Sequence, residues 1–233
     1  MLWKLLNPYF FTKYSTYLQK YILSSLIFCF AAGLYFAFTS PEDYQQSIMV
    51  RVMYIHVPSA WLSLMIFVII GMCAISCLIW KTNFTFYIAL ASAPIGATFA
   101  LITLLTGMIW GKPIWGTWWV WDARLTSMLI LFIFYIIFIL ISSSNRNIHK
   151  IQKPSCVIAI LGMINVPIVK FSVDLWSSLH QSASILNFNG PQIHGSMLAP
   201  LFIMFVANCL LYIFLLLQKV ESLLYKYKTT NHN

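Results

Sequence analysis

The chain has 233 residues, of which 61% are hydrophobic and only 8% are charged. Such a composition cannot present a water-compatible surface, which excludes an ordinary soluble protein and indicates an integral membrane protein. The net charge of +9 would suggest a nucleic-acid partner in a soluble protein. Here the basic residues flank apolar runs, so we interpret them as topology signals and expect no nucleic acid.

Six uninterrupted apolar stretches follow one another along the chain, each near or above the roughly 20 residues that a spanning helix needs. They cover residues 21–39, 58–80, 84–110, 125–143, 154–171 and 196–218. The fifth is the least regular, because Pro167 and Lys170 interrupt its far end. The first is long and lacks a small-residue cleavage site, so we expect no signal peptide. The prediction is an all-α integral membrane protein with six transmembrane helices, in which residues 1–233 form a single domain.

Basic residues concentrate on one side of these predicted spans. The N-terminal segment, the turn after the second span, the connection 144–153 and the C-terminal tail hold ten: Lys4, Lys13, Lys20, Lys81, Arg146, Lys150, Lys153, Lys219, Lys226 and Lys228. The other three connections hold four: Arg51, Lys112, Arg124 and Lys170. Because basic residues favour the inner side, both termini are predicted to be cytoplasmic, or matrix-facing in a mitochondrion, and these three connections to lie outside.

His56 comes just before the second span, in the sequence YIHVPSAW, and therefore on the predicted outer side. A single histidine near a helix end is more often a hydrogen-bonded structural residue than a metal ligand. Further candidate ligands on the same side of the membrane would favour the second role.

Residues 110–127, between the third and fourth spans, read WGKPIWGTWWVWDARLTS and hold five tryptophans in their first twelve residues. Tryptophan anchors spanning helices at bilayer interfaces, but anchoring does not require this density, which suggests a flat, apolar ligand for the external loop. Gly111, Pro113 and Gly116 argue against a regular helix in its first half. A short helix from Trp115 onward would bring four side chains onto one face: Trp115, Trp118, Trp119 and Asp122.

Two more histidines share the predicted outer side: His180 in the third outer loop and His194 at the start of the sixth span. A neutral imidazole is a good axial ligand for haem iron, and two can bind the iron from opposite faces. Together with the aromatic loop, the histidines favour haem. A zinc site is the weaker alternative, because cysteine partners and tight histidine spacing are missing, although Asp122 or Asp174 could contribute.

Charged residues of the tryptophan loop fit the same ligand. Arg124 could hold a haem propionate in bidentate fashion, and Lys112 could add a point charge. Without a ligand, the segment would be an interfacial amphipathic helix in which Asp122 and Arg124 form a surface ion pair worth under about 1 kcal/mol. Asp122 could instead orient a tryptophan N–H or the loop backbone.

The segment WGTWWVWDARLT, residues 115–126, resembles the WWD family of membrane haem-handling proteins, whose pattern WGxxWxWDxRLT is highly specific. Within that family, the length, the six spans and the segment HVPSAW resemble the CcmC family, the haem-delivery component of system I cytochrome c maturation. The resemblance covers nearly the whole chain.

The resemblance implies roles for particular residues. It places His56 and His180 as axial ligands of haem b, whereas His194 is a candidate only from its position. It assigns the haem-binding loop, which also faces the partner, to Trp115, Trp118, Trp119, Trp121, Asp122 and Arg124. The implied function is haem delivery rather than catalysis: haem is presented to the chaperone CcmE, together with CcmD and the ABC transporter components CcmA and CcmB. The implied location is a bacterial inner membrane, with a mitochondrial inner membrane as the alternative.

Three other functions compete with this interpretation. Larger WWD relatives are haem lyases, but those chains are longer and have additional spans. A haem-conducting permease would need titratable groups inside the spans, and few are present. A structural subunit of a respiratory complex would use the tryptophans only as lipid anchors.

Overall fold

The computed structural model describes residues 8–44, 46–145, 147–176, 180 and 193–230. Within these ranges the chain forms six long helices, each long and apolar enough to cross a membrane, which confirms the predicted six-span helical fold. They are α2 (Pro8–Thr39), α3 (Met53–Trp80), α4 (Asn83–Trp115), α5 (Ala123–Ser143), α6 (Ile148–Leu175) and α7 (Gly195–Thr230). A short 3-10 helix, η1 (Ile48–Val52), leads directly into α3.

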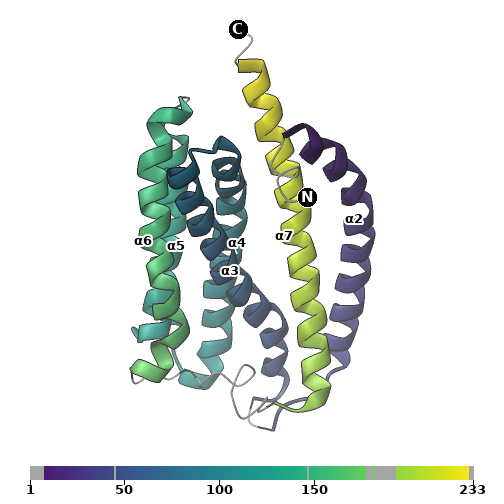
Figure 1. Ribbon diagram of the computed structural model, residues 1–233. Helices are drawn as coiled ribbons and strands as arrows, with labels where there is room; N and C mark the ends of the chain where they lie inside the picture. Colours follow the sequence, from purple (N-terminus) through teal and green to yellow (C-terminus); the bar gives the residue numbers. More distant parts are fainter. Residues whose placement is uncertain (1–7, 45, 146, 177–179, 181–192, 231–233) are drawn as a thin grey trace.

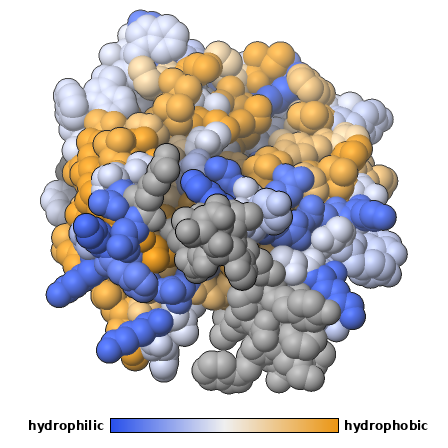
Figure 2. All heavy atoms as spheres, turned by 90° about the horizontal axis from the view of Figure 1, so that it is seen from above, coloured by the Kyte–Doolittle hydropathy of each residue, from blue (hydrophilic) through white to orange (hydrophobic). Residues whose placement is uncertain are grey.

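The helices run side by side, with α3 to α6 forming one group and α2 packing along α7 beside it (Figure 1). The start of α2 and the end of α7 lie at the same end of the bundle as the α3–α4 and α5–α6 connections (Figure 1). Viewed onto that end, hydrophilic residues lie among hydrophobic ones (Figure 2). The α2–α3 and α4–α5 connections, which hold few basic residues, lie at the opposite end (Figure 1). That this second end faces outward stays a prediction.

The bundle is tied together by polar contacts between buried side chains. The hydroxyl of Tyr135 on α5 donates to the backbone oxygen of Ser63 on α3, at 2.7 Å. Tyr135 reaches it past Gly96 of α4, where an added Cβ would collide with the phenol ring. One turn before Gly96 on α4, the hydroxyl of Ser92 lies 3.0 Å from that of Tyr212 on α7. Small residues that allow close helix approach, with hydrogen bonds across the interface, are typical of packing inside a bilayer.

The tryptophan-rich segment folds differently from our expectation. α4 continues through Gly111 and Pro113 and ends at Gly116, whose φ of 74° gives a left-handed C-cap. Gly111 leaves room for the ring of Trp115 to fold back on the helix, since an added Cβ would lie 2.8 Å from that ring. This packing explains why the glycine extends α4 rather than ending it. The short helix considered from Trp115 onward does not form, because residues 116–122 are not helical.

The helices also extend beyond the predicted spans at the end of the fifth span and at the start of the second. α6 continues through Pro167 and Lys170 to Leu175. His56 lies in the first turns of α3, not in a loop before it. Longer helices leave shorter connections, so His56 on α3, Trp115 on α4 and Lys170 on α6 are held by helices.

The close approach at Gly96 gives a stability prediction. Gly96→Val should force α4 away from Tyr135 and destabilise the protein by about 1–3 kcal/mol, the usual cost of overpacking a core. Tyr135→Phe, which removes one interhelical hydrogen bond, should cost only about 0.6 kcal/mol. Thermal unfolding of the purified protein in detergent measures both. Gly195→Val is the matched control, because nothing lies within 4 Å of the Cβ position there; equal stability of the two valine variants would contradict the packing.

Candidate functional site

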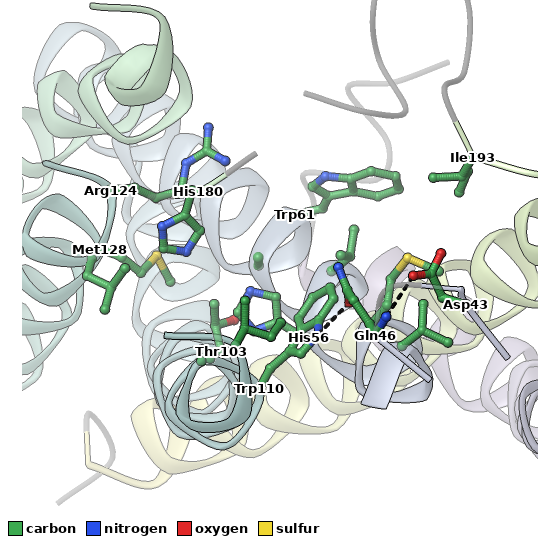
Figure 3. A pocket seen from close by; sticks show the side chains of 18 of the residues that line it. Asp43, Gln46, His56, Trp61, Thr103, Trp110, Arg124, Met128, His180 and Ile193 are labelled. Carbon is green, nitrogen blue, oxygen red and sulfur yellow. Dashed lines mark hydrogen bonds between the residues drawn. The ribbon is translucent and has the colours of Figure 1, made fainter. Parts of the chain in front are cut away.

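One cavity of about 1170 Å³ lies at the end of the bundle where α3 begins and α4 ends. It exceeds the roughly 300–1,000 Å³ of most small-molecule sites. Figure 3 shows His56 and His180 at this cavity, with Trp110 beside His56 and Arg124 above His180. Its lining includes several of the predicted site residues: His56, Trp115, Trp119, Arg124, His180 and His194. Segments distant in the sequence therefore meet at one site.

His56 is held in a defined tautomer by α4. Its Nδ1 lies 3.0 Å from the hydroxyl oxygen of Thr106. That hydroxyl donates its hydrogen to the backbone oxygen of Ile102, at 2.6 Å. The hydroxyl oxygen therefore accepts from Nδ1–H of His56, and the lone pair of the neutral ring is on Nε2, the form in which imidazole binds a metal.

His180 has the same tautomer for a different reason. Its Nδ1 lies 3.0 Å from Oδ2 of Asp122, and a carboxylate can only accept, so Nδ1 donates. The other oxygen, Oδ1, accepts from the backbone N–H of Leu125 at 2.8 Å and caps α5. The ring of His180 also meets Trp115 edge to face, with centroids 4.8 Å apart. Carboxylate–histidine pairs of this kind orient metal-ligating imidazoles and raise their basicity.

The burial of Asp122 decides between the roles considered for it. Its side chain is only 6% exposed and accepts from the backbone of Leu125 and from His180, so it is not the solvent-exposed carboxylate of an interfacial helix. Burial lowers the pKa of His180 below its ordinary value of 6.5, and the hydrogen bond to Asp122 opposes that shift. The net effect favours the neutral, metal-binding ring.

The four tryptophans predicted to bind a ligand divide into two pairs. Trp115 and Trp119 line the cavity. Within the described structure, Nε1 of Trp119 is buried without a hydrogen-bond partner, so it is a donor available to a ligand. Trp118 and Trp121 are 53% and 75% exposed and face away from the protein interior.

The two cations proposed for the loop also separate. Arg124 lines the cavity, as does Lys170, which was not among the predicted site residues. Lys112 instead donates to the backbone oxygen of Gly116 at 2.9 Å and lies 5.8 Å from the ring centroid of Trp118. It closes the turn at the end of α4 and is not among the cavity residues.

His194 lies at the cavity but has the opposite tautomer. Its Nδ1 accepts from the backbone N–H of Ser196 at 3.3 Å and lies 2.8 Å from the hydroxyl of the same residue. The hydrogen of the neutral ring is then on Nε2, so the lone pair is already engaged at Nδ1. His194 is therefore less suited to an iron than the other two. Among the described residues no group of three or more His, Cys, Asp or Glu could hold a metal ion, so the zinc alternative gains no support there.

Trp110 and Gln46 also line the cavity, and neither was an individual candidate from the sequence. Trp110 is part of the tryptophan-rich segment but was not singled out, and Gln46 lies in a short polar connection with no recognisable pattern. Only the three-dimensional arrangement connects them with His56.

The family of the chain follows from its similarity to known proteins. The sequence model of the CcmC family, described as "Heme exporter protein C", matches residues 1–233. The chain belongs to the CcmC family.

Relatives of this CcmC-family chain occur in bacteria and in plant mitochondria. "Heme exporter protein C" of Haemophilus influenzae is 39% identical over 237 residues, covering 97% of this chain and 94% of the relative. The protein of that name from Bradyrhizobium diazoefficiens is 39% identical over 218 residues, with coverages of 94% and 83%. A "Putative cytochrome c biosynthesis ccmC-like mitochondrial protein" of Marchantia polymorpha is 40% identical over 204 residues, with coverages of 87% and 86%. Both membranes considered for this chain are thus represented among its relatives.

The environment of His180 predicts its titration in the ligand-free CcmC-family protein. An ordinary histidine is half protonated near pH 6.5. Because burial lowers its pKa, His180 should be mostly neutral at that pH and gain its proton only as the pH falls further. Asp122→Asn should lower the pKa again, since it removes the group that stabilises the charged ring. ¹⁵N NMR of histidine-labelled protein measures this, with His180→Gln to assign the signal; a midpoint at or above pH 6.5 would contradict the burial argument.

Proposed function

We propose that this chain holds haem at the outer face of the inner membrane and delivers it to the haem chaperone CcmE for cytochrome c biogenesis. The observation that carries the proposal is the pair His56 and His180. They come from distant segments, line one cavity, and each has its Nδ1 engaged so that the Nε2 lone pair can bind iron. Haem is the cargo of this process, and the protein does not transform it as an enzyme would.

The remaining cavity residues fit haem b. Trp115 and Trp119 supply aromatic surface for a porphyrin. The guanidinium of Arg124 suits a propionate, and the unpartnered Nε1–H of Trp119 is a second donor for a carboxylate. A buried donor without a partner costs free energy in the ligand-free protein, and a propionate oxygen would recover it.

Trp118 and Trp121 form an exposed aromatic surface beside the cavity, which suits recognition of the chaperone. Both are more than half exposed, and Trp121 packs edge to face on Trp119 with centroids 5.4 Å apart. Exposed aromatic residues are enriched in protein interfaces. A chaperone bound at Trp121 would therefore also press on Trp119, which lines the cavity. We propose the partners CcmD, CcmA and CcmB on the basis of family membership. We do not assign them to a particular surface.

The proposed orientation follows from charge. Ten of the 14 Lys and Arg residues belong to the terminal segments and to the segments around the α3–α4 and α5–α6 connections. These connections lie at the end of the bundle away from the cavity, so the positive-inside rule favours an outward-facing cavity. In a bacterium that side is the periplasm. The alternatives are a haem-conducting permease and a non-haem structural subunit of a respiratory complex.

The first prediction concerns the iron ligands. His56→Ala or His180→Ala should each lower the affinity for added haem at least tenfold and replace the low-spin spectrum of the purified protein with a high-spin one, because one axial bond is lost. His194→Ala is the matched control and should keep the low-spin spectrum. Absorption spectroscopy during haem titration measures both. A colourless wild-type protein that binds no added haem, or unchanged spectra in both variants, would exclude the bis-histidine site.

The second prediction separates binding from delivery. The double variant Trp118→Ala/Trp121→Ala should keep its haem but lower haem-dependent crosslinking to CcmE at least fivefold, since it removes exposed surface only. Trp119→Ala should instead weaken haem binding itself. Normal crosslinking in the double variant would exclude this surface as the docking site.

A further inference from the structure

A hydrogen bond connects the α2–α3 connection with the last turns of α4. Nε1 of Trp110 donates to Oε1 of Gln46 at 2.9 Å (Figure 3). Gln46 is itself fixed, because its backbone N–H donates to Oδ1 of Asp43, also at 2.9 Å. The turn is closed by the backbone N–H of Ser47, which donates to the oxygen of Asp43 at 2.8 Å. The acceptor for the indole is thus held in place by a compact turn.

The indole held in this way is the neighbour of a proposed iron ligand. Trp110 meets the ring of His56 at 76°, with centroids 5.6 Å apart. Thr106, one turn earlier on the same helix, accepts from Nδ1 of His56. The His56 imidazole is therefore restrained in two ways: the Thr106 hydroxyl holds its Nδ1, and the indole of Trp110 contacts its ring.

We propose that Gln46 is a positioning residue that acts through Trp110 to fix the plane of the His56 imidazole at haem iron. The inference rests on the function proposed above, because it concerns the orientation of an axial ligand. Gln46 and Trp110 both line the cavity together with His56.

The two restraints on His56 do different things. The hydrogen bond to Thr106 fixes the position of Nδ1 but leaves the ring some freedom to tilt about that contact. The edge-to-face contact with Trp110 limits that tilt only while the indole itself stays in place. Loss of the Gln46 acceptor leaves Nε1 of Trp110 without its partner in a half-buried site, which favours reorientation of the indole.

The angle between two axial imidazole planes is visible in ferric low-spin haem. It sets the splitting of the iron d orbitals and so the g values of the electron paramagnetic resonance (EPR) spectrum. A fixed plane gives one sharp set of g values, whereas a distribution of planes broadens and shifts them. This signal reports ligand orientation and is independent of haem delivery.

The test uses the full-length protein, purified in detergent and loaded with ferric haem. Gln46→Leu should shift and broaden the g values while haem affinity falls by no more than about tenfold, the low end of outer-shell effects. Trp110→Phe, which keeps an aromatic ring but lacks Nε1–H, should give the same change. The double variant should change no more than either single variant, because both remove the same interaction. Gln46→Glu keeps an acceptor oxygen and should preserve the wild-type spectrum.

Gln19→Leu is the matched control. Gln19 is also half-buried and hydrogen-bonded, to Ser15 and Glu221 at 3.1 Å each, but at the other end of the bundle. It should leave the spectrum unchanged. Wild-type g values in Gln46→Leu would overturn the positioning role, and Trp110→Phe provides the same test if the leucine variant does not fold. Such a result would not contradict the proposed haem site itself. A wild-type protein that binds no haem would overturn the proposed function and this inference with it.

Discussion

The carboxylate of Asp122 connects the packing of the bundle with the chemistry of the cavity. One oxygen caps α5 and the other accepts from His180, so the start of a membrane helix fixes a residue that follows α6. A carboxylate that is 6% exposed would be costly without such partners. The charge-assisted contact of His180 with Asp122 is stronger than its edge-to-face contact with Trp115, so we expect it to contribute more to holding His180 at the cavity.

The two proposed ligands are held in unlike ways. His56 belongs to a helix and has a neutral hydroxyl partner, whereas His180 follows a helix and has an anionic one. Both arrangements leave the Nε2 lone pair for a metal, and both lie at one end of the bundle rather than in its middle. Away from the cavity, the helices pack against one another through polar contacts such as the hydrogen bond from Tyr135 to Ser63. A ligand held at such an end can be reached by a soluble partner domain.

Sequence patterns predicted the six spans and the segments that contain the candidate residues, because hydropathy and charge can be read from neighbouring residues. They could not predict that α4 passes through Gly111, since this depends on the indole of Trp115 filling the space above it. They also grouped four tryptophans that the fold divides into two that line the cavity and two that are exposed. Gln46 carries no local signal at all, because a glutamine in a short polar connection acquires its role only through Trp110, which is 64 residues further along. The tautomers of the three histidines likewise depend on partners brought near by folding.

The central claim is that one cavity binds haem iron between His56 and His180. An experimental map of the haem-loaded, full-length protein in a lipid nanodisc tests it most directly. The account predicts density for iron bonded to Nε2 of both residues, with the porphyrin against Trp115 and Trp119. Haem bound elsewhere, or iron bonded to His194 in place of either residue, would contradict it.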